Sequence, residues 1–77
     1  MKVRVDLYVN LKKYASSGDS SFEIQIESGA TIKTVLEVLK IPKEEKLVVL
    51  INGRNADESG RLKEKDTITL YSPISGG

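Results

Sequence analysis

The spacing of hydrophobic residues in this chain changes abruptly at residues 28–31, Ser-Gly-Ala-Thr. Before this break, apolar residues occupy every second position in 3–9 and again in 22–26. A period of two is typical of a half-buried strand, whereas spacings of three and four residues are typical of an amphipathic helix. The sequence therefore predicts two strands and then one helix that needs a sheet to cover its apolar side. The helical spacing joins Ile32, Val35, Leu36 and Leu39.

Both ends of the helix carry signals. Thr31 is the predicted N-cap, because its hydroxyl can accept a hydrogen bond from a free amide of the first turn. Pro42 is the predicted stop, because the residue before a proline is pushed out of the helical region. These limits predict a helix of about three turns.

The second half of the chain predicts three more strands. The continuous apolar run 47–51 favours a central strand covered on much of both sides. Asn52-Gly53 tolerates positive φ and predicts a hairpin that leads into a brief edge strand at 54–56. Ser59-Gly60 marks another turn, Leu62 is an apolar residue in a polar loop, and 67–71 forms the last strand, with Ile68 and Leu70 on one face.

The element order is strand, strand, helix, strand, short strand, strand. The first and last strands can lie parallel in the middle, with the helix across one face of a mixed sheet of four to five strands. This is the β-grasp arrangement of the α+β class. Residues 1–71 are the predicted domain, and 72–77 are a flexible tail ending in Gly-Gly. The polar connection 10–21 is expected to cover the core edge with Leu11 and Tyr14.

Composition excludes several function classes. The chain contains no cysteine and no histidine, which excludes disulfides, thiolate metal sites, cysteine nucleophiles and histidine general bases. No acidic cluster has the ligand spacing of a calcium loop, so we expect no metal site. The net charge is +1, with basic and acidic residues interspersed and few aromatics, which argues against nucleic-acid binding. The first residues alternate apolar with charged side chains, so we expect no membrane contact and a cytoplasmic protein.

The tail Ser72-Pro73-Ile74-Ser75-Gly76-Gly77 has two interpretations. Glycine costs the most backbone entropy to order and adds no side chain to a core, so the tail can be a frayed terminus. Alternatively, the glycines make a thin tip that enters a space where no residue with a Cβ fits.

Five segments together resemble the ubiquitin-like sulfur carriers of the MoaD/ThiS type, over essentially the whole chain. The residues of the tail are closest to the small subunit of molybdopterin synthase, although Ser72 stands where many such proteins have a first proline. Carriers for thiazole formation or tRNA thiolation, a ubiquitin-like modifier that joins Gly77 to lysines, and a plain β-grasp binding module remain alternatives. The segments are 3–8, 30–32, 49–53, 62–68 and the final Gly76-Gly77.

The resemblance implies a carrier rather than an enzyme, with no bound cofactor. An E1-like enzyme would adenylate Gly77 with ATP, and a persulfide sulfur donor would convert it to a thiocarboxylate. The sulfur would then pass to a precursor held by a second partner, in the molybdopterin case a molybdopterin synthase large subunit. Gly76 would clear the path of Gly77 down a narrow channel that also receives the other tail residues, Ser75, Ile74 and Pro73.

Partner contact is expected on the sheet face away from the helix. Tyr8 and Tyr71 are predicted to face outward there on adjacent central strands, and exposed aromatics are favoured interface anchors. Shielding of their neighbours is the alternative role for these tyrosines. Arg54 and Arg61 are further candidates, because they can pair with acidic groups of a partner, although most surface charges are only solvated.

Overall fold

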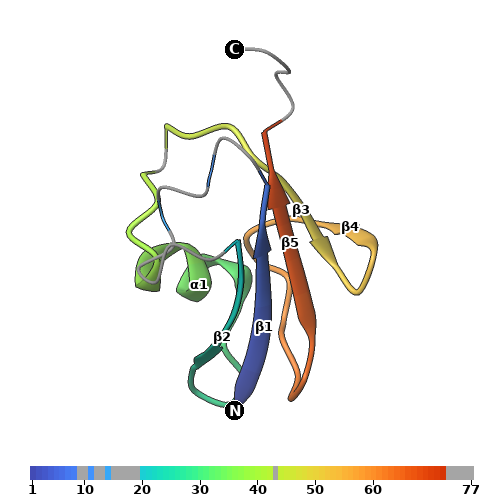
Figure 1. Cartoon of the computed structure of the whole chain (residues 1–77). Helices are drawn as coiled ribbons and strands as arrows, with labels where there is room; N and C mark the ends of the chain where they lie inside the picture. The colour runs from blue at the N-terminus through green and yellow to red at the C-terminus, as the bar shows by residue number, and fades with distance from the viewer. Residues whose placement is uncertain (9–10, 12–13, 15–19, 43, 73–77) are drawn as a thin grey trace.

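A computed structural model describes residues 1–8, 11, 14, 20–42 and 44–72, which form a five-stranded mixed sheet with one helix (Figure 1). The strand order is β2-β1-β5-β3-β4. β1 and β5 run parallel in the middle of the sheet, and the other pairs are antiparallel. The predicted β-grasp arrangement is therefore confirmed. The elements are β1 (Lys2–Leu7), β2 (Ser21–Gln25), α1 (Ile32–Val38), β3 (Val48–Ile51), β4 (Arg54–Ala56) and β5 (Thr67–Tyr71).

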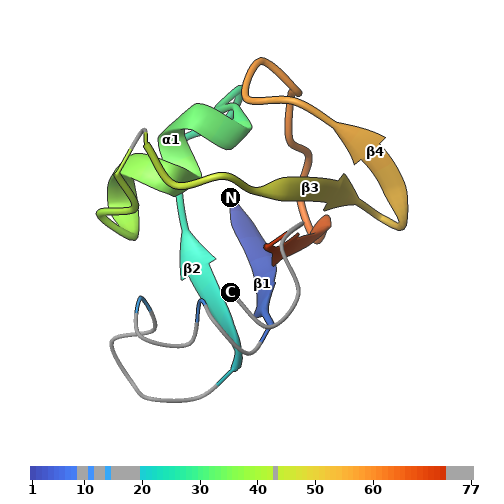
Figure 2. The same cartoon turned by 90° about the horizontal axis from the view of Figure 1, so that it is seen from above.

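The core lies between the two central strands and α1, which packs across one face of the sheet (Figures 1 and 2). The alternation in β1 and β5 sends every second side chain to this layer. Leu11 and Leu62 close its margins from two loops, as predicted for both. Fully buried side chains include Val3, Val5, Leu7, Ile32, Val35, Ile68 and Leu70.

The start of α1 is capped by another part of the chain. Thr31 occupies the N-cap position with an extended backbone, but its side chain makes no capping hydrogen bond, so that part of the prediction was wrong. Instead, the amides of Ile32 and Lys33 donate to the carbonyl oxygens of Gly60 and Glu58, at 3.0 and 2.9 Å. The loop after β4 returns beside α1 (Figure 2) and supplies the acceptors that a capping side chain otherwise provides.

α1 ends at Val38, before Pro42 as predicted, but earlier in the chain than the proline requires. Lys40 adopts a positive φ of 59°. The amide of Ile41 donates to the carbonyl of Leu36 at 2.9 Å, and the amide of Lys40 donates to that of Glu37 at 3.1 Å. These two bonds define a Schellman motif, which ends the helix by itself. The helix is 7 residues long and therefore shorter than predicted.

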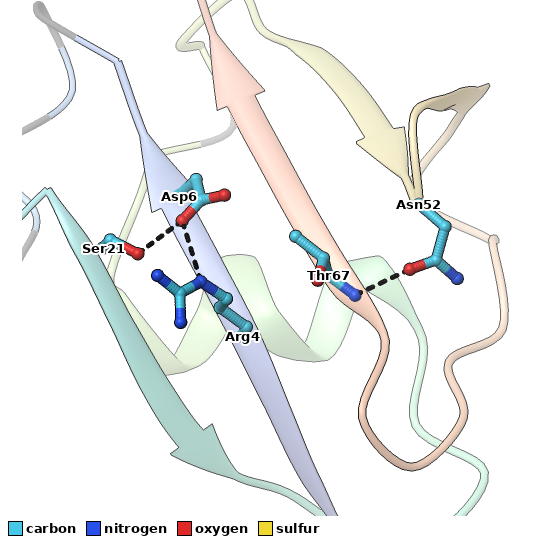
Figure 3. Close-up of polar contacts among 5 residues, drawn as sticks. All are labelled: Arg4, Asp6, Ser21, Asn52 and Thr67. Atoms are coloured by element: carbon cyan, nitrogen blue, oxygen red, sulfur yellow. Dashed lines mark hydrogen bonds and ion pairs between the residues drawn. The ribbon is translucent and has the colours of Figure 1, made fainter.

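The hairpin between β3 and β4 forms at the predicted position. Asn52 and Gly53 both have positive φ, 52° and 84°. The Asn52 side chain also accepts a hydrogen bond from the Thr67 amide at 2.9 Å (Figure 3) and donates one to the carboxylate of Asp66 at 2.9 Å. That carboxylate is buried and accepts a further hydrogen bond from the amide of Lys63. Two turns at one end of the sheet are thus held together.

β3 is an interior strand as predicted, but it is covered less than the prediction of cover on much of both sides. Val49 is its one buried residue, and the rest of the strand is half-buried. Because α1 covers one face of the sheet alone, alternate residues of β3 face the open side.

In the part of the chain that the structure describes, no helix is long and apolar enough to cross a membrane. Val9, at the end of the first predicted strand, and Lys12-Lys13 lie outside the described residues, as do Pro73, Ile74, Ser75, Gly76 and Gly77.

Candidate functional site

The open face of the sheet, opposite α1, is built from residues that alternate with the core positions. Val5 and Leu7 of β1 pair with Ile68 and Leu70 of β5 on the core side. Their sequence neighbours therefore share the opposite face. On β5, Thr69 and Tyr71 lie on this face. They are near the carboxyl end of the strand, after which the tail follows in the sequence.

Tyr8 and Tyr71 are in contact on this face. The amide of Tyr8 donates to the carbonyl of Leu70 at 3.1 Å, which extends the parallel ladder by one residue beyond β1. The two rings lie edge to face, with centroids 6.2 Å apart and an interplanar angle of 61°. Tyr8 is 58% exposed, and Tyr71 is half-buried. The predicted adjacency of the tyrosines is confirmed.

β3 extends the aromatic pair into an apolar surface. Val48 lies opposite Tyr71, and Leu50 lies opposite Thr69. Both aliphatic side chains are half-buried. Together with the tyrosine rings they form an apolar surface over β3, β5 and the residue after β1, which we call the tyrosine face. It consists of Tyr8, Tyr71, Val48 and Leu50.

Sequence reasoning missed Val48 and Leu50, because an unbroken apolar run hides its own alternation. A signal was nevertheless present in the hairpin. A two-residue turn at Asn52-Gly53 pairs Leu50 with Asn55 and Val49 with Ala56, as observed. Because Asn55 is polar, its partner Leu50 is expected on the outward side of the sheet. Because Ala56 is apolar, its partner Val49 is expected on the core side.

A polar cluster on β1 and β2 borders the tyrosine face. The Arg4 Nε lies 3.5 Å from Asp6 Oδ1, and the Ser21 hydroxyl donates to the same oxygen at 2.6 Å (Figure 3). Asp6 lies opposite Thr69 in the β1–β5 register, so the charged and apolar parts of the open face meet at β5. The Arg4 side chain is exposed and that of Asp6 is half-buried, so solvent screens the ion pair and its contribution to stability is small.

The two candidate arginines lie away from the tyrosines. Arg54, on the edge strand β4, pairs with Ile51, which in turn pairs with Ile68 of the core. Arg54 therefore lies on the α1 side of the sheet. Arg61 pairs with Thr31 in an isolated bridge at the start of α1. Both are exposed, but the structure does not bring either of them to the tyrosine face.

The described part of the open face is a candidate binding surface. Among the described residues, no group of three or more acidic residues is placed to hold a metal ion. The open face offers phenol rings, aliphatic side chains and hydroxyls, and the chain contains no histidine or cysteine. Such a surface can dock a partner.

Comparison with known proteins gives one family and one fold. The ThiS family model matches residues 5–77. No curated protein sequence matches the chain.

Three solved structures illustrate the fold. SAMP1 from Haloferax volcanii is similar, at 21% identity, with all of both chains covered and a TM-score of 0.81. A putative molybdopterin converting factor subunit 1 from Pyrococcus furiosus is 23% identical, with 96% of this chain and 99% of that one covered and a TM-score of 0.79. In a complex of subunits 1 and 2 of the molybdopterin-converting factor from Helicobacter pylori, the matching chain is 22% identical, fully covered in both directions, with a TM-score of 0.69.

Proposed function

The chain belongs to the ThiS family of ubiquitin-like sulfur carriers and small modifiers, and from this premise we propose that it donates sulfur for molybdopterin synthesis through Gly77. The observation that carries the proposal is the position of the tyrosine face. It lies at the carboxyl end of β5, a few residues before Gly76-Gly77 in the sequence. A partner docked on Tyr8 and Tyr71 would therefore receive the tail.

The proposed chemistry uses the carboxylate of Gly77. A carboxylate is a poor electrophile, and its attack on ATP produces an acyl adenylate with release of pyrophosphate. The outer sulfur of a persulfide then displaces AMP to give an acyl disulfide. A thiol of the sulfur donor or the activating enzyme attacks the sulfur next to the donor, which breaks the S–S bond, leaves the thiocarboxylate on Gly77 and forms a disulfide on the protein that supplied the thiol. An E1-like enzyme and its sulfur donor supply the acid–base groups, so this chain acts as a cosubstrate.

The proposed acceptor is a molybdopterin synthase large subunit. The Helicobacter pylori relative was solved as a complex of subunits 1 and 2 of a molybdopterin-converting factor, and its fold spans the whole of this chain. An aromatic and aliphatic strip such as the tyrosine face is a suitable surface for an enduring subunit contact. Carriers for thiazole formation or tRNA thiolation would use the same tail with another acceptor.

The test is an intact mass measurement. The purified chain is incubated with ATP, an E1-like enzyme and a persulfide donor, and then with a molybdopterin synthase large subunit and its precursor substrate. The expected result is a mass gain equal to sulfur replacing oxygen, followed by loss of that gain as molybdopterin forms. If the chain gains sulfur but does not transfer it to the precursor on this large subunit, the molybdopterin assignment is contradicted. The role as a sulfur carrier is not.

Modification of proteins is the second candidate, since SAMP1 from Haloferax volcanii, a small archaeal modifier protein, shares the fold over the full length of both chains. The same incubation discriminates the two functions. Conjugates of high mass, joined to lysines through Gly77, would favour the modifier.

Gly76→Val provides a variant for the tail. We expect it to fold as the parent does, since Gly76 follows the last strand, but to fail in adenylation. A Cβ and two methyl groups beside Gly77 would obstruct a narrow channel in the activating enzyme. ATP–pyrophosphate exchange measures the step, with Ser28→Val, at an exposed turn outside the tail, as the matched control. Normal exchange by Gly76→Val would contradict the role of the glycine.

A further inference from the structure

A groove lies on the other side of the molecule, between α1 and the β3–β4 hairpin. Its volume is about 500 Å³. Ile41 and Val49 are buried in its floor, and its other apolar residues are half-buried. Because the groove stays open, this apolar surface remains in contact with solvent, and a partner side chain could cover it. The apolar floor consists of Leu36, Ile41, Leu47, Val49 and Ala56.

The rim of the groove is acidic. Four carboxylates line it, against one described cation, Lys33. This contrasts with the chain as a whole, which has 12 basic and 11 acidic residues. The rim therefore concentrates negative charge that the molecule does not have on average. The four residues are Glu37, Glu45, Asp57 and Glu58.

Two of the rim carboxylates are held in place by hydrogen bonds. The Tyr14 hydroxyl donates to Glu45 Oε1 at 2.6 Å. The hydroxyl and the amide of Ser59 donate to Asp57 Oδ1 at 2.6 and 3.0 Å. These Ser59 hydrogen bonds lower the pKa of Asp57, so its carboxyl is ionised at neutral pH. Hydrogen bonds thus fix the orientation of two of the four rim carboxylates.

We propose that this groove docks a cationic amphipathic segment of a partner protein. Aliphatic side chains of the segment would cover the floor, and lysines or arginines beside them would face the rim. Charge complementarity selects this occupant, because an acidic or neutral peptide would leave the carboxylates unpaired. A metal ion does not fit, since no three acidic residues in the described part of the chain converge on one point.

The groove is separate from the tyrosine face. Val49 and Ala56 of its floor are a register pair on the α1 side of the sheet. Val48 and Leu50 of the tyrosine face alternate with them along β3 and point to the opposite side. A partner in the groove and a partner on the tyrosine face can therefore bind together. The groove inference does not depend on any chemistry at Gly77.

The probe for the test is a synthetic peptide of Leu and Lys in helical spacing, of about 12 residues, near the length at which isolated helices begin to form. It is titrated into the full isotope-labelled chain, and amide shifts are followed by NMR. The expected shifts lie at Leu36, Ala56 and Glu58 and leave Thr69 and Tyr71 unchanged. Binding should weaken as salt is added, because exposed charges are screened.

Two double variants distinguish the effect of the rim carboxylates from the effect of the overall net charge. Glu37→Lys with Glu58→Lys should raise the Kd at least about tenfold, because the cationic peptide then meets like charges on the rim. Glu23→Lys with Glu27→Lys makes the same change in net charge at exposed positions outside the groove, and should raise the Kd less than about twofold. Unchanged thermal unfolding of both variants shows that they fold.

Two further peptides test the floor and the charge. Replacing Leu by Ser in the probe should abolish binding, and replacing Lys by Glu should do the same. The inference is overturned if the peptide shifts the tyrosine face or shifts nothing. It is also overturned if both double variants weaken binding equally, or if the Ser peptide binds as tightly as the parent.

Discussion

Asn52 combines a left-handed backbone conformation with two side-chain hydrogen bonds. The first property lets the β3–β4 hairpin turn within two residues. The second connects that hairpin to the turn before β5, because the side chain reaches the buried carboxylate of Asp66 and the amide of Thr67. Glycine could satisfy the backbone here, but only a short amide side chain satisfies both requirements.

We expect Asn52→Ala to lower the free energy of unfolding by about 2–3 kcal/mol, from two lost hydrogen bonds and the cost of φ > 0 at a residue with a Cβ. Asn52→Gly loses the same bonds but not the backbone fit, so it should cost about 1 kcal/mol less. Urea unfolding of the two variants measures the difference. Equal losses would show that the backbone conformation at this position is not strained.

Asp57 gives a prediction about pH. The hydroxyl and the amide of Ser59 lower the pKa of its carboxyl below the ordinary value of 3.8. In the unfolded chain the carboxyl titrates near that ordinary value, so the folded state gains stability that is fully present above pH 3.8 and is lost as the pH falls through the lower, folded pKa. Ser59→Ala should raise the pKa of Asp57, as read by carboxyl NMR titration. Ser28→Ala, at an exposed turn elsewhere, should leave it unchanged.

At the scale of elements, α1 depends on the loop that follows β4. This loop supplies the carbonyl oxygens of Glu58 and Gly60 to the first amides of the helix. It is held in turn against β3, since a Cβ at Gly60 would lie 3.0 Å from Ile51 Cδ1 and 3.2 Å from the carbonyl oxygen of Asp57. The helix start, the loop and β3 therefore form one packed unit.

Thr31→Ala and Gly60→Ala should show where the helix is capped. Thr31→Ala should change the free energy of unfolding by less than about 0.5 kcal/mol, because its side chain makes no capping bond. Gly60→Ala should cost about 1–2 kcal/mol, because the added methyl group displaces the loop that caps the helix. Thermal unfolding provides both values. A larger loss for Thr31→Ala than for Gly60→Ala would overturn this account.

At the scale of the whole molecule, the sheet separates two surfaces of different character. The tyrosine face is aromatic and aliphatic, and it lies on the open side near the end of β5. The acidic groove lies on the α1 side, between the helix and the β3–β4 hairpin. The proposed function uses the first surface and leaves the second one free.

Tyr8→Arg with Tyr71→Arg should weaken binding to the proposed synthase large subunit by more than tenfold, because central aromatic anchors typically contribute about 2 kcal/mol or more to an interface. The fold should persist, since both rings lie on the open face. Arg54→Ala with Arg61→Ala is the matched control and should change the affinity much less, since neither arginine lies on the tyrosine face. Calorimetric titration measures both. A larger effect of the arginine pair would indicate that the interface lies on the other side of the sheet.

The sequence by itself determined the element types, the β-grasp order and the main core positions. Alternation in 3–7 and 67–71 requires one buried face, and the period change at residue 31 requires a helix over it. The turn at Asn52-Gly53 was equally readable, because few residue pairs tolerate positive φ. These signals are local, and the tertiary structure agrees with each of them.

Tertiary structure alone decided how the helix ends are satisfied and which side of β3 is open. Thr31 and Pro42 are sound local signals, but carbonyls from the loop after β4 and a Schellman motif at Lys40 satisfy the helix ends instead. The continuous run 47–51 contains no alternation of its own, so the assignment of Val48 and Leu50 to the tyrosine face comes from their pairing with β5. The acidic groove likewise joins residues from α1 to β4, because folding places distant charges around one apolar floor.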